Sequence, residues 1–411
     1  MWARVKLSDI GSVVGGATPS TSVEKYYGGE IAWVTPKDLS SFSGRYIECG
    51  ERNITEEGLN SCSAQLLPAG SVLFSSRAPI GYVAIAKNPI ATNQGFKSLV
   101  PDTKKVDSLF MYYLLKYNKN RIEAMGSGTT FKEVSGATMK NIEVNLPPLA
   151  EQKRIAAILG ALDDKIELNQ RINANLEEQA QALFKSWFVD FEPFRDSPFV
   201  DSELGKIPQG WKVCRLKNAT KEIIRGFTSK YVEKSDLINL NQKVNKGKYL
   251  DRQYYKYLNP QISIPSNKFA CQNDILLNSL GQGTLGRVHY YGELTPNIVI
   301  DQHITIIRAN NTTFQSSFIY LFLSSNEIQH SIEGMVTGST GMQMLNISQV
   351  REMSVLQPDV DTMNKFHRIV QPFFTKIRKN NTEIEIIANI RGILLPKLMS
   401  GEISVEKGFT D

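Results

Sequence analysis

The chain carries an internal repeat, and the repeat constrains its fold more than any single residue. The sequence MGSGTTF around Gly128 recurs as MVTGSTG around Gly338, at a shift of 338 − 128 = 210 residues. An apolar pattern of helical period follows each copy, and in it Asn169 matches Asn380 at a shift of 380 − 169 = 211. The repeat predicts two similar domains, each followed by a similar long helix.

Two further matches lie upstream of the glycine-rich segments. The sequence IGYV, which begins at Ile80, matches LGRV, which begins at Leu285. Asn93-Gln94 matches Asp301-Gln302. The correspondence therefore extends through the domains as well as the helices.

Short β-branched and aromatic runs separated by turn signals fill residues 1–148. They include IAWV at 31–34, SVLF at 71–74 and a final run at 142–146 that Pro147 and Pro148 stop. A helical segment near 106–119 interrupts them. This alternation is typical of a mixed α+β domain.

The pattern changes at Leu149, where apolar residues recur at alternating spacings of four and three. That spacing is the heptad signature of helices that pair along a seam, where buried asparagine fixes register at a cost in stability. Roughly 40 residues give a helix of about 60 Å. An amphipathic helix lying on its own domain is the alternative. The predicted seam residues are Ile155, Leu159, Leu162, Ile166, Asn169, Leu176, Leu183, Ile377, Asn380, Ile384, Ile387 and Leu394.

These patterns predict five segments. A first domain spans 1–148, a central spacer helix 149–192, a proline-containing linker 193–209, a second domain 210–358, and a C-terminal spacer helix with a tail 359–411. The predicted fold class is α+β, with two similar mixed domains separated by two long helices.

Positive charge is concentrated in the second half. Between Lys206 and Lys268 there are 14 Lys and Arg against four acidic residues, with aromatic residues interleaved, although the net charge of the chain is only +6. Such a patch suits phosphate-backbone binding, and a solvated lysine-rich face is the alternative. No apolar leader and no run of 18 apolar residues occurs, which predicts a cytoplasmic protein.

The sequence offers little support for catalysis or metal binding. Its four cysteines are scattered and its four histidines form no H-E-x-x-H motif. GQGTLG, which begins at Gly281, is formally a dinucleotide-binding motif, but a strand pattern follows it instead of a helix. We therefore predict the tip of a β-hairpin there.

The sequence resembles the DNA-specificity subunits of type I restriction–modification systems. The resemblance rests on GGATPST at 15–21, IAWVTPKDL at 31–39, ERNITEEGL at 51–59, LPAGSVLFSSRAPIGYVAIA, TNQGFKSLVP and GSGTTFKEVSG in the first half. It continues at LPPLAEQKRIAAILGALDDKI and DSELGKIPQGWKV, and more loosely at GQGTLGRV and IDQHITIIR.

The resemblance implies an architecture and a division of labour. The mixed domains would be target-recognition domains, each reading one half of a bipartite DNA target, and the helices would pair antiparallel as a spacer that sets the gap. By the resemblance, two modification subunits would dock on the helices and bring S-adenosylmethionine, and restriction subunits would bring ATP and Mg. The chain itself would be non-catalytic and hold no cofactor or metal.

Candidate DNA contacts follow from the cationic and hydroxyl residues in matching loops. Lysines suit phosphate, whereas arginines and amides also read base edges. Two alternatives remain: a methyltransferase or endonuclease whose catalytic part lies elsewhere, and a coiled-coil adaptor that ignores DNA. The candidates are Lys37, Arg77, Thr129, Thr130, Lys132, Arg225, Lys243, Lys246, Lys248, Arg287 and Ser339.

Overall fold

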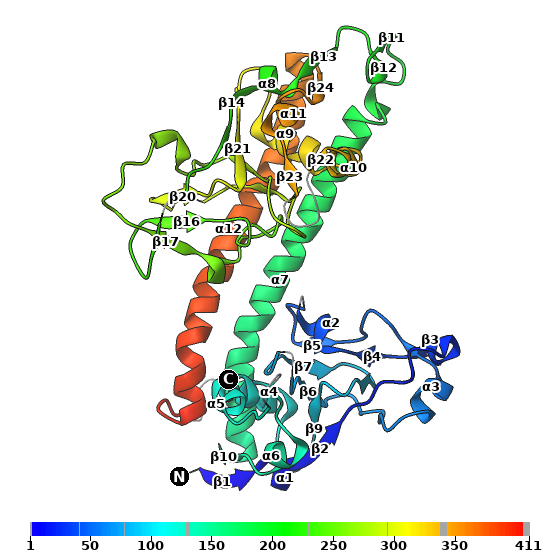
Figure 1. Cartoon of the computed structure of the whole chain (residues 1–411), viewed down its shortest axis with the longest axis vertical. Helices are drawn as coiled ribbons and strands as arrows, with labels where there is room; N and C mark the ends of the chain where they lie inside the picture. The colour runs from blue at the N-terminus through cyan, green and yellow to red at the C-terminus, as the bar shows by residue number, and fades with distance from the viewer. Residues whose placement is uncertain are drawn as a thin grey trace. The chain divides into compact units, whose positions relative to one another are not determined.

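The computed structural model describes residues 2–40, 42–77, 79–128, 132–228, 230–293, 295–337 and 343–405. It divides into two compact units, which are described separately. Unit 1 comprises Met1–Glu167 and Ile384–Asp411, and unit 2 comprises Leu168–Glu383. Each unit therefore contains one mixed domain and part of each long helix (Figure 1).

A five-stranded sheet organises the domain of unit 1. Its order is β2-β9-β6-β7-β5, and its neighbours are antiparallel except for the parallel pair β5 and β7. A separate antiparallel pair, β1 with β10, brings the first strand of the domain beside the last. The strands are β1 (Ala3–Lys6), β2 (Gly11–Gly15), β3 (Tyr27–Ile31), β4 (Trp33–Val34), β5 (Tyr46–Ile47), β6 (Val72–Phe74), β7 (Val83–Ala86), β8 (Ala91–Thr92), β9 (Lys97–Pro101) and β10 (Glu143–Leu146).

Short helices cover this sheet. In α4 (Ser108–Tyr117), the Asp107 carboxylate accepts a hydrogen bond from the Phe110 backbone N–H at 2.9 Å, which caps the helix. The apolar residues of α4 are buried in the core of unit 1. The other short helices of the unit are α1 (Leu7–Ile10), α2 (Pro36–Ser40), α3 (Glu56–Asn60), α5 (Lys119–Ala124) and α6 (Gly136–Lys140), with a 3₁₀ turn at Glu24–Tyr26.

Unit 2 repeats this framework. The order β14-β21-β18-β19 has the antiparallel pairing of β2-β9-β6-β7, and β13 pairs with β24 as β1 pairs with β10. The parallel pair β16 and β20 likewise corresponds to β4 and β8. The strands are β13 (Lys212–Arg215), β14 (Thr220–Arg225), β15 (Tyr231–Val232), β16 (Ile238–Leu240), β17 (Lys256–Leu258), β18 (Ile275–Asn278), β19 (Val288–Tyr290), β20 (Ile298–Ile300), β21 (Ile304–Ala309), β22 (Val336–Thr337), β23 (Met344–Leu345) and β24 (Ser354–Gln357).

The short helices α8, α9, α10 and α11 of unit 2 follow the chain order of α1, α4, α5 and α6 in unit 1. They are α8 (Leu216–Ala219), α9 (Ser316–Ser324), α10 (Asn326–Gly334) and α11 (Ile347–Arg351), with 3₁₀ turns at Arg252–Tyr254 and Ser266–Lys268. The predicted linker is not irregular throughout. After a 3₁₀ turn at Glu192–Phe194 it forms a hairpin of β11 (Phe199–Ser202) and β12 (Gly205–Pro208).

Two long helices, α7 (Leu149–Phe188) and α12 (Val360–Ser400), run antiparallel. In unit 2, Asn169 Nδ2 donates to Glu383 Oε2 at 2.9 Å, whereas the Phe188 ring lies 4.8 Å from the Phe366 ring. Later residues of α7 therefore meet earlier residues of α12. The predicted fold class, with two mixed domains and an antiparallel helix pair, is confirmed.

The helices also pack on the domains, so both arrangements considered for them occur. Ile155 and Leu159 of α7 and Leu398 of α12 belong to the core of unit 1. Phe184 of α7 and Phe366 of α12 belong to the core of unit 2. Of the other predicted seam residues, Ile166, Asn169, Ile377 and Asn380 are buried, and Leu162, Leu176, Leu183, Ile384, Ile387 and Leu394 are half-buried.

Candidate DNA-binding surface

The two units share a turn at the end of corresponding strands. In unit 1, Asn93 Oδ1 accepts a hydrogen bond from the Gly95 backbone N–H at 2.9 Å. In unit 2, Asp301 Oδ1 accepts the equivalent bond from the His303 N–H, also at 2.9 Å. The side chains of Gln94 and Gln302 are exposed between these bonded residues. The matching dipeptides therefore mark equivalent turns.

A glycine directly after β2 and another directly after β14 allow the chain to approach each turn closely. A Cβ atom on Gly16 would lie 2.1 Å from the Asn93 carbonyl oxygen, and one on Gly226 would lie 2.2 Å from the Asp301 carbonyl oxygen. Contacts this short exclude any side chain at these positions. Gly16 and Gly226 therefore pack against the two turns in the same way.

Backbone hydrogen bonds connect each turn to a residue that follows the glycine-rich segment of its unit. The Ser76 N–H donates to the Gly95 carbonyl at 2.7 Å, and the Val134 N–H donates to the Ser76 carbonyl at 3.0 Å. In unit 2, the Ser279 N–H donates to the His303 carbonyl at 2.9 Å, and the Leu345 N–H donates to the Ser279 carbonyl at 2.9 Å. The predicted DNA contacts Thr129, Thr130 and Ser339 lie outside the described residues.

In unit 1, the other candidate residues are ion-paired or exposed. Lys37 Nζ contacts Glu51 Oε2 at 2.7 Å, and this carboxylate raises the pKa of Lys37. Arg77, directly after Ser76, has Nη1 at 3.6 Å from Glu133 Oε2. Lys132 is exposed. Arg77 therefore lies at the turn, partly neutralised by an acidic neighbour.

Arg225 lies beside the corresponding turn of unit 2. It directly precedes Gly226, and its Nη2 donates to the carbonyl of Leu345. Burial lowers the pKa of Arg225, because its guanidinium is desolvated. Lys268 Nζ donates to the Arg225 carbonyl at 2.7 Å, which adds positive charge at this edge.

The remaining candidates of unit 2 lie on two neighbouring segments, 243–248 and the hairpin tip at 281–287. β18 and β19 are antiparallel on either side of that tip, which confirms the predicted hairpin. Arg287 Nη2 donates to the Gly283 carbonyl at 2.9 Å, whereas Lys243 is exposed. Lys246 lies 4.5 Å from the centroid of the Tyr254 ring.

Two buried asparagines that sequence reasoning missed connect these segments. Asn245 Nδ2 donates to Asn278 Oδ1 at 3.0 Å, and Asn278 Nδ2 donates to the carbonyls of Gln242 at 3.0 Å and Thr284 at 3.1 Å. Buried amides are stable only when they are hydrogen-bonded. No sequence motif distinguishes these asparagines from the others, so only the structure reveals that they set the loop geometry.

Lys248 contacts a buried carboxylate of α7. Its Nζ lies 4.0 Å from Glu177 Oε2, and the Glu177 side chain is 13% exposed. Burial raises the pKa of Glu177 to about 7, although the Lys248 cation lowers it in part. The lysine is therefore a partner for a helix carboxylate as well as a candidate phosphate contact.

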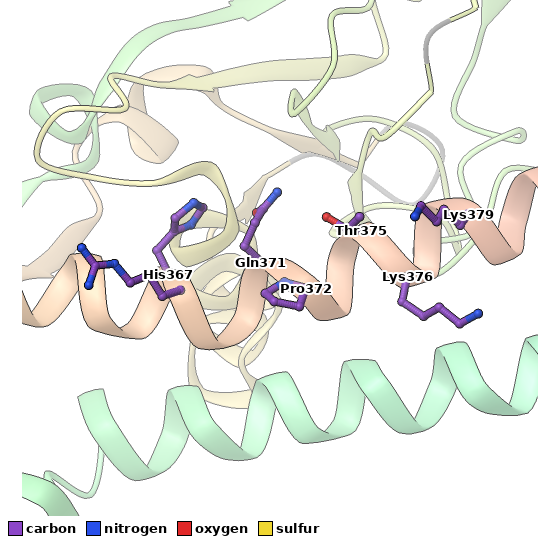
Figure 2. Close-up of a pocket in the computed structure, with 7 residues that line it drawn as sticks. His367, Gln371, Pro372, Thr375, Lys376 and Lys379 are labelled. Carbon is purple, nitrogen blue, oxygen red and sulfur yellow. The ribbon is translucent and has the colours of Figure 1, made fainter.

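A hollow of about 610 Å³ runs along α12 in unit 2 (Figure 2). Its lining is basic and includes His367, Arg368, Lys376 and Lys379 around Pro372. Within the described residues, no three His, Cys, Asp or Glu side chains form a group that could hold a metal ion. Over the same residues, no helix is long and apolar enough to cross a membrane.

Comparison with known proteins identifies the class. Residues 1–178 match the family described as the type I restriction modification DNA specificity domain. The chain is 38% identical to the type I restriction enzyme MjaIX specificity subunit of Methanocaldococcus jannaschii, over 99% of this chain and 94% of that protein. It is 24% identical to the HindI specificity subunit of Haemophilus influenzae, over 88% and 92%.

A solved structure has the same fold. The type I restriction–modification S subunit from M. genitalium superposes with a TM-score of 0.55 at 17% identity, over 97% of this chain and 96% of that one. The 38% identity over 99% of the chain establishes that it belongs to the specificity subunits of type I restriction–modification systems. Members of this family are the non-catalytic components that recognise the DNA target.

The Glu177 carboxyl predicts a pH dependence of stability. Its folded-state pKa of about 7 exceeds the ordinary value of 4.5, so folding favours its protonated form, and that stability is lost as the pH rises from 4.5 to about 7. Glu177→Gln should therefore raise the free energy of unfolding at pH 8, by at most roughly 3 kcal/mol, and much less at pH 5. Urea unfolding at both pH values measures this difference.

The control for that experiment is Glu178→Gln, since Glu178 is the adjacent, exposed residue of α7. It should change the pH profile only slightly, because the Glu178 carboxylate is the smallest of the causes that act on the pKa of Glu177. Equal stability of the Glu177→Gln variant and the wild-type chain at pH 8 would show that Glu177 carries no desolvation cost.

Proposed function

We propose that the two domains each read one half of a bipartite, asymmetric DNA target. The observation that carries this proposal is the pair of equivalent turns, each fixed by a glycine and a serine, which present different side chains from the same backbone frame. The two turns share their backbone hydrogen bonding, but the third residue is Gly95 in one turn and His303 in the other. Two domains with the same backbone turn but different side chains on it would recognise two different half-sites.

The candidate cationic residues would divide between two roles. Exposed lysines such as Lys37, Lys132 and Lys243 would contact phosphate and release counterions. Arg77 and Arg225, beside the turns, would lie where base edges are read. Thr129, Thr130 and Ser339 would contribute hydroxyls from the glycine-rich segments.

The two helices would set the number of unread base pairs between the half-sites. Two features support this: each helix is continuous over 40 or 41 residues, and their pairing is fixed by specific polar contacts. A continuous helix rises about 1.5 Å per residue and does not change length when ligands bind. Helix length would therefore be translated into half-site spacing.

Modification subunits would dock on the helices. α12 exposes Ile386, Ile390 and Ile393, which are 55%, 41% and 60% exposed and share one face at helical spacing. The basic hollow around Pro372 lies on the same helix. An exposed apolar stripe is typical of a protein–protein interface.

The partner subunits would supply the chemistry, in the cytoplasm. Two modification subunits would bring S-adenosylmethionine and methylate an adenine that is flipped out of the duplex. Restriction subunits would bring ATP-dependent translocation and cleavage. The chain described here would determine only where these activities are directed.

The bipartite target can be tested by mapping methylated adenines in the genome of cells that express the chain with its modification subunits. We expect one asymmetric motif with two unlike specified halves and a fixed unspecified gap, and its loss when the gene of this chain is deleted. A continuous motif without a gap would contradict the proposal. Methyl transfer by the purified chain alone would also contradict it, because the chain would then be a methyltransferase.

The docking surface can be tested by placing charge on the exposed stripe. The double variant Ile386→Glu and Ile393→Glu should lose co-purification with the modification subunits, because burying two carboxylates in an apolar interface is costly. Val360→Glu is the matched control, since Val360 is 52% exposed and begins the same helix. Retained co-purification of the double variant, with unchanged helix content by circular dichroism, would exclude this face.

A further inference from the structure

The turn of unit 2 contains a buried carboxylate that organises its neighbours. Asp301 is fully buried, and its oxygens accept from the His303 backbone N–H at 2.9 Å and from the Tyr231 hydroxyl at 3.2 Å. The His303 ring is a third partner, because its Nδ1 contacts Asp301 Oδ1. A single carboxylate thus orients a histidine and a tyrosine at the tip of the domain.

This arrangement fixes which nitrogen of His303 is free. A carboxylate can only accept hydrogen bonds, so the Nδ1 atom that contacts Asp301 carries the hydrogen. The other nitrogen, Nε2, is then an acceptor in the neutral ring. The His303 side chain is 34% exposed, and no hydrogen bond to Nε2 occurs among the residues that the structure describes.

Tyr231 supports the same orientation from the opposite oxygen of Asp301. Burial and the Asp301 carboxylate raise the pKa of Tyr231 to about 12, so its hydroxyl keeps its hydrogen and donates it. Asp301 is therefore a positioning residue, whose hydrogen bonds limit rotation of the imidazole.

Unit 1 lacks this device at the equivalent position. There the turn has Asn93 and Gly95, with the same backbone hydrogen bond but no ring and no acidic group. Contacts to phosphate carry no sequence information, so two domains with the same backbone framework are expected to share such contacts. A side chain present on only one of two equivalent turns is instead typical of a residue that distinguishes bases.

The residues connected to His303 are consistent with a position at the DNA. Ser279 links the His303 carbonyl to Leu345, which follows the glycine-rich segment, and Arg225 donates to the carbonyl of that same leucine. The exposed Gln302 precedes the histidine. Arg225 is therefore connected to the His303 backbone through Leu345 and Ser279, and an exposed amide side chain adjoins His303 in the chain.

We propose that His303 is a base-reading residue of the second domain. Its Nε2 would accept a hydrogen bond from the exocyclic amino group of an adenine or a cytosine, the amino donors of the major groove. Asp301 would keep Nε2 directed outward. This inference rests on the proposed function, and it assigns one specified position of the second half-site to one named atom.

The test uses the full chain expressed with its modification subunits, with methylated adenines mapped across the genome. His303→Ala should leave the half-site read by unit 1 and the gap unchanged. At one position of the other half-site, specified as adenine or cytosine in the wild type, discrimination should fall about tenfold, the size of a typical single mismatch effect. Asp301→Asn keeps the turn amide bond seen at Asn93 and should weaken the same position to a smaller degree.

His330→Ala is the matched control, because His330 is exposed on α10 and lies outside the turn. It should leave the motif unchanged. An unchanged motif in His303→Ala would overturn the inference while leaving the proposed function intact. Equal weakening at every position of the second half-site would also overturn it, since the histidine would then only support the turn. A wild-type chain that gives no bipartite motif would overturn the proposed function and this inference together.

Discussion

The antiparallel pairing of α7 and α12 is the constraint on which the architecture depends. At its polar layer, Asn173 Nδ2 donates to Asn381 Oδ1 at 2.7 Å, and Asn380 Nδ2 donates to Asn173 Oδ1 at 2.7 Å. Asn380 is fully buried and its own carbonyl oxygen has no partner among the described residues, which costs stability. Amides in an apolar seam find partners in one register only, so the same layer that destabilises the pair also fixes it.

Ion pairs between the helix elements and the domain extend this constraint within unit 1. Arg45 is only 4% exposed, and it binds Asp164, Glu167 and the Gly160 carbonyl on α7. Asp163 of the same helix accepts from Arg391 of α12 and from the Tyr113 hydroxyl of α4. Because Arg45 and Asp163 are themselves buried, removal of their partners would leave a charge buried without compensation. The domain and the helix pair of unit 1 are therefore coupled by buried charge as well as by apolar packing.

Repetition and period made much of the fold predictable. A seven-residue apolar pattern interrupted by asparagine is visible in one sequence, and Asn169 and Asn380 are indeed buried. The sequence shows only that Asn93-Gln94 matches Asp301-Gln302. It does not show the side-chain hydrogen bond that closes each turn or the glycine that packs against it. The Asn245 and Asn278 pair and the Asp301 and His303 pair depend on contacts over the sheet or within one turn, for which hydrophobic periodicity gives no signal. The candidate DNA contacts rest on charge and loop position alone, so they stay predictions.

The measurement that tests the central claim most directly is an exchange of one reader. Residues 210–358 would be replaced by the equivalent segment of the Methanocaldococcus jannaschii relative, which aligns over 99% of the chain, and the methylated motif would be mapped. If each domain reads its own half-site, the hybrid should keep one half of the original motif and the original gap, and replace the other half. A hybrid that folds with its modification subunits but changes both halves, or neither, would contradict the account of two independent readers on one helix pair.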